Sequence, residues 1–107
     1  MVGVCIVTEL EIGRSARSTA DHVRQVALLS GLVPVYVTPR SEARVRDIQR
    51  DLVDTGTHRA VSVPDLMVAA VADVERLTVL HYDADFDLIA SVTGQPTEWV
   101  VPRGSVD

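Results

Sequence analysis

Apolar and polar positions alternate along the chain in a way typical of a protein that switches repeatedly between strand and helix. Short apolar runs predict strands at 2–7, 33–38, 78–80 and 98–101. No Asn-Gly or similar hairpin turn joins two of these runs, so the pattern predicts an α/β fold with a mainly parallel sheet. The helices predicted between the runs cover residues 8–13, 18–31, 41–54, 63–77 and 86–94.

Two of these helices have distinct patterns. In 41–54, apolar residues fall on one face and charges of both signs on the others, which indicates a surface helix with a solvated charged side. In 63–77, the stretch 66–72 is apolar all round, which indicates a helix buried between layers. Pro64 and Asp65 stand where a helix start prefers them.

Composition limits the class of protein. The chain has 107 residues, 47% hydrophobic and 23% charged, which suits one small globular domain. No stretch approaches the ~20 apolar residues of a membrane span, so a cytoplasmic protein is expected. The net charge of −5 argues against a surface that grips nucleic acid by itself, so a polyanionic substrate would need a metal or a partner. Cys5 is expected to be a reduced core residue.

The segment HYDADFDLI places three aspartates, Asp83, Asp85 and Asp87, at alternate positions after an apolar run. They match the start of a calcium-binding loop, but Leu88 stands where that loop needs glycine and Gly94 where it needs glutamate. A simpler interpretation is that Asp83 caps the following helix, Asp85 interacts with its dipole and Asp87 is solvated.

A second interpretation involves more of the chain. In a parallel α/β sheet, the strand ends and the helix starts that follow them gather along one edge. Glu9, Asp65, Asp83 and Asp85 could all reach that edge, where they would repel one another unless a divalent cation such as Mg²⁺ stood between them. Such a cation would activate water and offset charge on a phosphate.

Other kinds of site find little support in the sequence. There is no Gly-rich phosphate loop, no zinc-binding set of Cys and His, no HExxH motif and no nucleophile elbow. The histidines are scattered, and we interpret them as surface or structural residues: His22, His58 and His81.

Four segments in order, TELEIG, HRAVSVPDLMVAA, LTVLHYDADFDLIA and TGQPTEWVVPRGS, resemble PIN-domain ribonuclease toxins of VapBC-type toxin–antitoxin systems. The resemblance runs from about Val4 to Ser105. It implies a PIN-like three-layer fold and a Mg²⁺- or Mn²⁺-dependent endoribonuclease that cleaves RNA. It also implies a cytoplasmic toxin that forms a homodimer and is held inactive by a cognate antitoxin.

The resemblance assigns roles to the acids one by one. Glu9 matches the acid of the family's second motif, Asp65 that of the third and Asp83 the first acid of the final motif. Asp85 is the second acid of that final motif. Together these four carboxylates are expected to bind metal and activate water, without a covalent intermediate.

The start of the chain departs from the family pattern. The family opens with a strand that ends in an aspartate, followed by helices, whereas Met1 falls where the second strand would begin. We therefore expect residues 1–107 to form a single PIN-like domain that is truncated at the N-terminus and has one metal ligand fewer. The alternative function is a catalytically inactive PIN remnant that binds an antitoxin or another protein.

If RNA binds, arginines are the expected phosphate contacts. Arg14 and Arg17 are the candidates, because they follow the predicted helix that carries Glu9. Simple solvation of both side chains is the competing interpretation.

Overall fold

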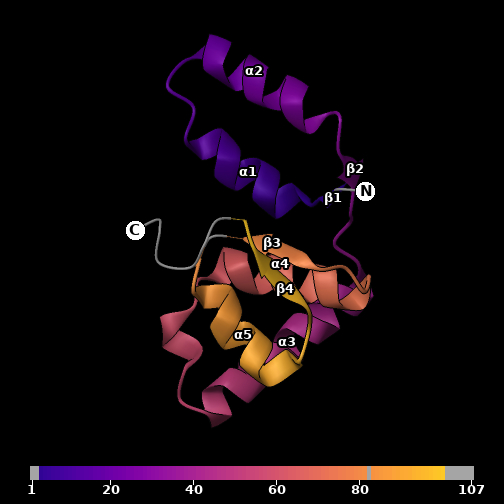
Figure 1. Ribbon diagram of the computed structural model, residues 1–107, viewed down its shortest axis with the longest axis vertical. Coiled ribbons are helices and arrows are strands. Elements are labelled where there is room, and N and C mark those ends of the chain that lie inside the picture. Colours follow the sequence, from indigo (N-terminus) through magenta and orange to yellow (C-terminus); the bar gives the residue numbers. More distant parts are fainter. Residues whose placement is uncertain (1–2, 82, 101–107) are drawn as a thin grey trace. The chain divides into compact units, whose positions relative to one another are not determined.

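Helices make up most of the computed structural model, which describes residues 3–81 and 83–100 (Figure 1). The chain divides after Val37 into two compact units, and each is described by itself. Both contain one pair of strands, and both pairs are parallel. The prediction of a mainly parallel α/β protein is therefore confirmed, with the strands in two separate pairs.

The first unit consists of two short strands and two helices. Strand β1 (Gly3–Val4) pairs with β2 (Val33–Pro34), and helices α1 (Ile6–Arg14) and α2 (Thr19–Leu29) pack against each other between them in sequence. Helix α2 begins as the sequence predicts, because Ser18 accepts a hydrogen bond from a main-chain N–H in the first turn.

Both predicted strands of this unit are shorter than expected. The apolar run 2–7 holds only β1, because the chain turns into α1 from Ile6, and Val2 lies outside the described residues. The run 33–38 holds only β2, because its partner strand β1 ends at Val4 and Thr38 is already the cap of the next helix. The apolar runs therefore predicted longer strands than β1 and β2, which have two residues each.

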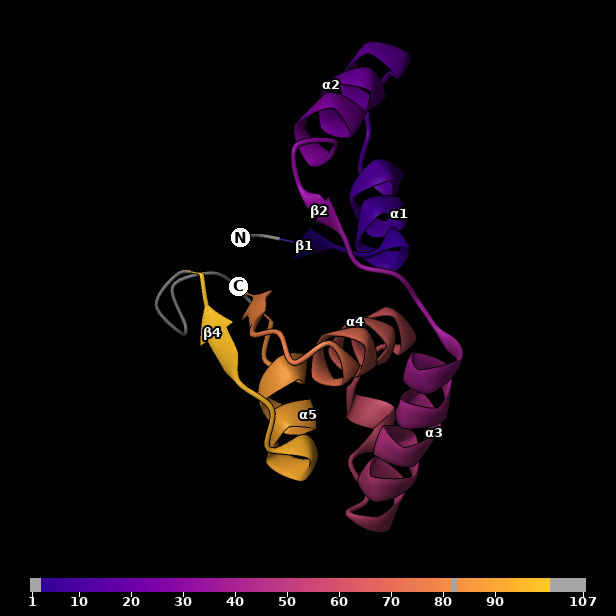
Figure 2. The ribbon, with the colours of Figure 1, turned by 90° about the vertical axis from the view of Figure 1, so that its right-hand side faces the viewer.

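The second unit contains most of the helical residues. Figure 2 shows strand β4 on one side of helix α5 and helix α3 on the other. Its elements in order are α3 (Pro39–Asp54), the 3₁₀ turn η1 (His58–Ala60), α4 (Val63–Val74), β3 (Val79–His81), α5 (Asp85–Thr93) and β4 (Thr97–Trp99).

Helix α3 begins two residues before the predicted start at Ser41. Thr38 and Ser41 form a reciprocal cap: the Ser41 N–H donates to Thr38 Oγ1 (3.2 Å), and the Thr38 N–H donates to Ser41 Oγ (2.7 Å). Pro39 then takes the first helical position, where its missing N–H costs nothing. Ser41 is therefore the third residue of the helix and is buried.

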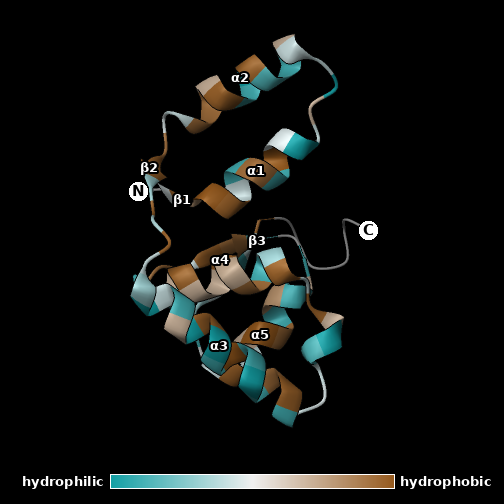
Figure 3. Ribbon diagram, turned by 180° about the vertical axis from the view of Figure 1, so that it is seen from behind, coloured by the Kyte–Doolittle hydropathy of each residue, from teal (hydrophilic) through white to brown (hydrophobic). Residues whose placement is uncertain are grey.

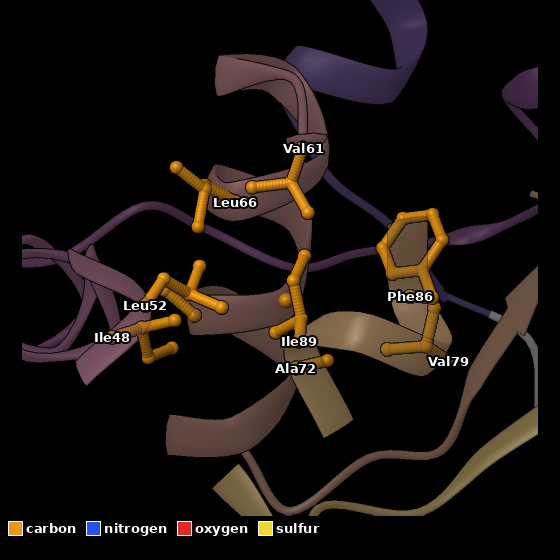
Figure 4. Packing of buried hydrophobic residues seen from close by; sticks show 10 residues of the cluster. Ile48, Leu52, Val61, Leu66, Ala72, Val79, Phe86 and Ile89 are labelled. Atoms are coloured by element: carbon orange, nitrogen blue, oxygen red, sulfur yellow. The ribbon is translucent and has the colours of Figure 1, made fainter. Parts of the chain in front are cut away.

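The core of the second unit lies where α3, α4 and α5 meet (Figure 4). The apolar face of α3 contributes Ile48 and Leu52, which are fully buried, and α5 contributes Phe86 and Ile89. Helix α4 packs against both of these helices and β3, which explains why it is apolar all round as predicted. Its buried residues are Leu66, Ala69, Ala70, Val71 and Ala72.

Strands β3 and β4 form the parallel pair of this unit, with Val79 opposite Thr97 and His81 opposite Trp99. The final predicted strand was 98–101, of which Val101 lies outside the described residues. In the described part of the chain, no helix is long and apolar enough to cross a lipid bilayer.

Candidate metal centre

Three carboxylates from different parts of the second unit meet at one place. One oxygen each of Asp65, Asp83 and Asp85 lie within 4.8 Å of one another. Asp65 is in the first turn of α4, Asp83 follows β3, and Asp85 opens α5. The starts of two helices and the end of a strand thus converge, as strand ends and helix starts do in parallel α/β folds.

Capping at the start of α4 positions the first of these acids. The Asp65 N–H donates to Ser62 Oγ (3.2 Å), and Pro64 occupies the first turn. These two residues define where the helix begins, so the side chain of Asp65 lies at its N-terminus. The positive end of the helix dipole favours negative charge there.

A run of hydrogen bonds connects this helix start with the other two acids. The Ser62 N–H donates to Asp85 Oδ2 (3.0 Å), and the Asp85 N–H donates to Asp83 Oδ1 (2.9 Å). The Asp83 N–H in turn donates to His81 Nδ1 (3.3 Å). The N-cap of α5 is Ala84, which makes no side-chain capping bond, so Asp83 is not the cap that the simpler interpretation expected; its Oδ1 accepts instead from the N–H of Asp85, the first residue of the helix.

The acids of this cluster share an excess of negative charge. Burial raises the pKa of Asp65 from 3.8 to about 7, assisted by hydrogen bonding to Asp85 and Asp83 and by the charge of Asp83, against a smaller lowering by Ser62. The ion pairs of the described residues join Arg24 to Asp21, Arg44 to Asp73 and Arg50 to Asp47. None of these pairs includes an acid of the cluster, so no arginine ion pair among the described residues offsets its charge.

The donor set fits a hard divalent cation. All three groups are carboxylates, and oxygen ligands are those that Mg²⁺, Mn²⁺ and Ca²⁺ prefer. Asp83 is exposed while Asp65 and Asp85 are half-buried, so an ion could reach the cluster from solvent. A soft zinc site would need sulfur or nitrogen ligands, and the set contains neither.

The fourth predicted acid, Glu9, lies in the other unit. It is half-buried in the first turn of α1. Because each unit is described by itself, the structure brings together three of the four predicted acids, and the role of Glu9 stays a prediction. Arg14 and Arg17 are exposed in the same unit, at the end of α1 and just after it.

Asp87 differs from its prediction. It is half-buried, and Trp99 Nε1 donates a hydrogen bond to its Oδ1 (3.3 Å), so the interpretation of a solvated side chain was wrong. The tryptophan stands far along the chain in β4, and no local pattern could indicate this contact.

Two residues around the cluster were missed as contributors. Ser62 precedes Asp65 at the spacing of a helix cap, which is a signal that the sequence did contain. His81 carried no such signal, and it is buried at the end of β3.

Known proteins resemble this chain in sequence. The model of the PIN domain family matches residues 1–92. Ribonuclease VapC51 of Mycobacterium tuberculosis (strain ATCC 25618 / H37Rv) is 45% identical over 101 residues, which cover 94% of this chain and 73% of that protein. Ribonuclease VapC21 of the same organism is 46% identical over 103 residues, with 94% of this chain and 74% of the relative covered.

Solved structures resemble it in fold. VapBC-5 from Mycobacterium tuberculosis, a member of the VapBC family of toxin–antitoxin systems, superposes with a TM-score of 0.70 at 23% identity, covering 92% of this chain and 80% of that one. DNA-bound VapBC from Salmonella typhimurium gives a TM-score of 0.72 at 20% identity, covering 91% of this chain and 74% of that one. At these identities the likeness concerns the fold alone.

Proposed function

This chain belongs to the PIN-domain family, among the VapC ribonucleases, and we propose that it is a metal-dependent endoribonuclease toxin of a type II toxin–antitoxin system. The observation that carries the proposal is the meeting of Asp65, Asp83 and Asp85 within 4.8 Å. Burial, with hydrogen bonds to Asp85 and Asp83 and the charge of Asp83, raises the pKa of Asp65 to about 7, and a divalent cation bound among the three carboxylates would favour their charged forms.

Asp65, Asp83 and Asp85 would hold the ion, Mg²⁺ or Mn²⁺, and the metal-binding and catalytic role of Glu9 stays a prediction from the sequence. A bound divalent cation supplies an activated water and offsets charge on the scissile phosphate. Asp65 must give up the proton that it holds up to about pH 7 before its carboxylate can serve as a ligand. The hydrogen bonds to Asp83 and Asp85 orient these two carboxylates beforehand.

We also propose that both units belong to one PIN-like domain, because the family model spans residues 1–92 and so includes both. RNA is the substrate, and the expected location is the cytoplasm. Arg14 and Arg17 remain the proposed phosphate contacts.

Protein partners are a cognate antitoxin and a second copy of the chain. The first unit offers a suitable surface, since several apolar side chains of its helices are exposed. Figure 3 shows hydrophobic positions along both α1 and α2. Apolar side chains exposed together are common where another protein binds. Those more than half exposed on the two helices are Ile6, Leu10, Val23, Val26 and Leu28.

RNA cleavage by purified protein in Mg²⁺ or Mn²⁺ tests the catalytic proposal. We expect cleavage by the wild type, abolition by a chelator, and loss of activity in Asp65→Asn and Asp83→Asn. Asp54→Asn is the matched control, because Asp54 is an exposed acid at the end of α3, outside the cluster. Equal background cleavage by all four proteins would contradict the assignment.

Calorimetric titration with Mn²⁺ separates the proposal from its alternative, a catalytically inactive PIN remnant that binds an antitoxin or another protein. An active enzyme should show a binding site that is weakened by Asp83→Asn and unaffected by Asp54→Asn. A protein that binds no Mn²⁺ and cleaves no RNA would favour the remnant.

A further inference from the structure

His81 occupies an unusual place for a polar residue. It ends β3 and is only 4% exposed, at a position where an apolar side chain would fit the buried face of the strand. Its ring contacts two aromatic rings, with centroid distances of 5.1 Å to Phe86 and 4.8 Å to Trp99. A phenylalanine ring would therefore satisfy the packing at this position.

The two ring nitrogens of His81 have different surroundings. Nδ1 accepts a hydrogen bond from the Asp83 N–H (3.3 Å), so in the neutral ring the proton is on Nε2. Nε2 is buried and has no hydrogen-bond partner among the described residues. Burying a polar ring with one unpartnered nitrogen disfavours folding, and packing gives no reason to keep it.

What Nδ1 provides is an anchor for the carboxylate cluster. It holds the main chain at Asp83, whose Oδ1 accepts from the Asp85 N–H, while Asp85 Oδ2 accepts from the Ser62 N–H. His81 is therefore the buried end of the run of hydrogen bonds that orients two of the three acids. Without it, the Asp83 N–H would lose its hydrogen bond to the buried ring, and the Asp83 carbonyl would keep only its bond from the Phe86 N–H (3.2 Å).

We propose that His81 is a positioning residue of the metal centre: its Nδ1 fixes the main chain of Asp83 so that the carboxylate faces Asp65 and Asp85. The inference rests on the proposed function, because a cation must bind the three acids for their alignment to matter. In this role the neutral His81 ring acts as a hydrogen-bond acceptor, with Nδ1 accepting from the Asp83 N–H.

Two substitutions separate the acceptor from the ring. His81→Phe keeps an aromatic ring against Phe86 and Trp99 and removes Nδ1, whereas His81→Asn keeps an acceptor near the position of Nδ1 and removes the ring. We expect Mn²⁺ affinity, measured by calorimetry, to fall about tenfold in His81→Phe, as for other groups that orient metal ligands. In His81→Asn the affinity should return toward that of the wild type. His58→Phe, at a histidine of η1 outside the cluster, is the control and should bind as the wild type does.

The outcomes are distinct. Wild-type affinity in His81→Phe, or equally weak binding in both His81 variants, overturns the positioning role, since the first shows that Nδ1 is not needed and the second shows that an acceptor at this position does not restore binding. If the wild type itself binds no Mn²⁺, the proposed function fails instead.

Because a substitution in the core can prevent folding, ¹⁵N NMR of the imidazole nitrogens in the wild type provides a second measurement. We expect a proton on Nε2 and none on Nδ1, with and without Mg²⁺. A proton on Nδ1 would contradict the proposal, because that nitrogen could not then accept from Asp83.

Discussion

Asp65 shows how the surroundings of one residue decide its chemistry. Its identity and position resemble an ordinary acid in the first turn of a helix, where the dipole favours its charged form. Burial and the neighbouring Asp85 and Asp83 act in the opposite direction and raise its pKa to about 7. The balance between these effects depends on residues about twenty positions away, so it could not be read from the helix alone.

This raised pKa makes stability depend on pH in the metal-free protein. The folded state keeps a proton that the unfolded chain releases above a pKa of 3.8, so this group's contribution to the free energy of unfolding falls as pH rises from about 4 to about 7. Asp65→Asn should remove this dependence. At about pH 8, the free energy of unfolding of the variant should exceed that of the wild type by on the order of 1 kcal/mol, after discounting for solvent screening. At about pH 4 the two proteins should differ little.

Urea unfolding in the presence of a chelator, at both pH values, measures this difference. A variant that is less stable than the wild type by the same amount at both would show that Asp65 keeps no extra proton in the fold.

At the scale of elements, helix ends show where local sequence was sufficient. Helix α5 ends at Gly94 with φ 70°, as the glycine predicted. Helix α4 was predicted to reach residue 77 but ends at Val74, because Arg76 adopts φ 56° and the Leu77 N–H returns to the Ala72 carbonyl (2.8 Å). An arginine gives no signal for a left-handed residue, so this end was missed.

Arg76→Gly should stabilise the protein. A left-handed conformation costs an L-residue about 1–2 kcal/mol, from which the greater freedom of glycine in the unfolded chain subtracts up to about 1 kcal/mol. The expected gain is thus roughly 0.5–1 kcal/mol, seen as a Tm higher by a few degrees. Gly94→Ala tests the reverse change: among the described residues other than its chain neighbours, no atom lies within 4 Å of an added Cβ, so its expected loss of about 1 kcal/mol reports backbone strain alone. A lower Tm in Arg76→Gly would contradict this account.

The charged side of α3 was predicted to be solvated, and one of its arginines is not. Arg44 Nε lies 2.6 Å from Asp73 Oδ2 of α4, with both side chains about three-quarters buried. Arg50 pairs with Asp47 on the same helix, where the arginine side chain is 69% exposed and the aspartate side chain 49%. Arg44→Ala should therefore cost about 1–2 kcal/mol in thermal or urea unfolding, and Arg50→Ala less than about 0.5 kcal/mol. Equal losses in the two variants would argue against an ion pair that joins the helices.

At the scale of the whole molecule, the carboxylate cluster links metal binding to folding. A ligand that binds only the folded state stabilises it, by about 2.7 kcal/mol when its concentration is a hundred times Kd. We expect Mg²⁺ or Mn²⁺ to raise the Tm of the wild type by several degrees at about pH 8, and a chelator to reverse the effect. Asp83→Asn should lose most of this rise while Asp54→Asn keeps it. A rise of equal size in both variants would indicate binding elsewhere on the protein.

The order of helices and strands, the caps at Ser18 and Ser62, the glycine end of α5 and the apolar face of α3 were determined by residues within a few positions of each other. Capping, helical periodicity and backbone conformation act over that distance, so the sequence by itself was sufficient for them. The meeting of Asp65 with Asp83 and Asp85, the buried acceptor of His81 and the hydrogen bond between Trp99 and Asp87 were decided only by tertiary structure. The contacts of Asp65 and of Trp99 join separate helices and strands, and the packing of α4 and β4 against α5 sets their distances, while the burial of His81 comes from the aromatic rings around it.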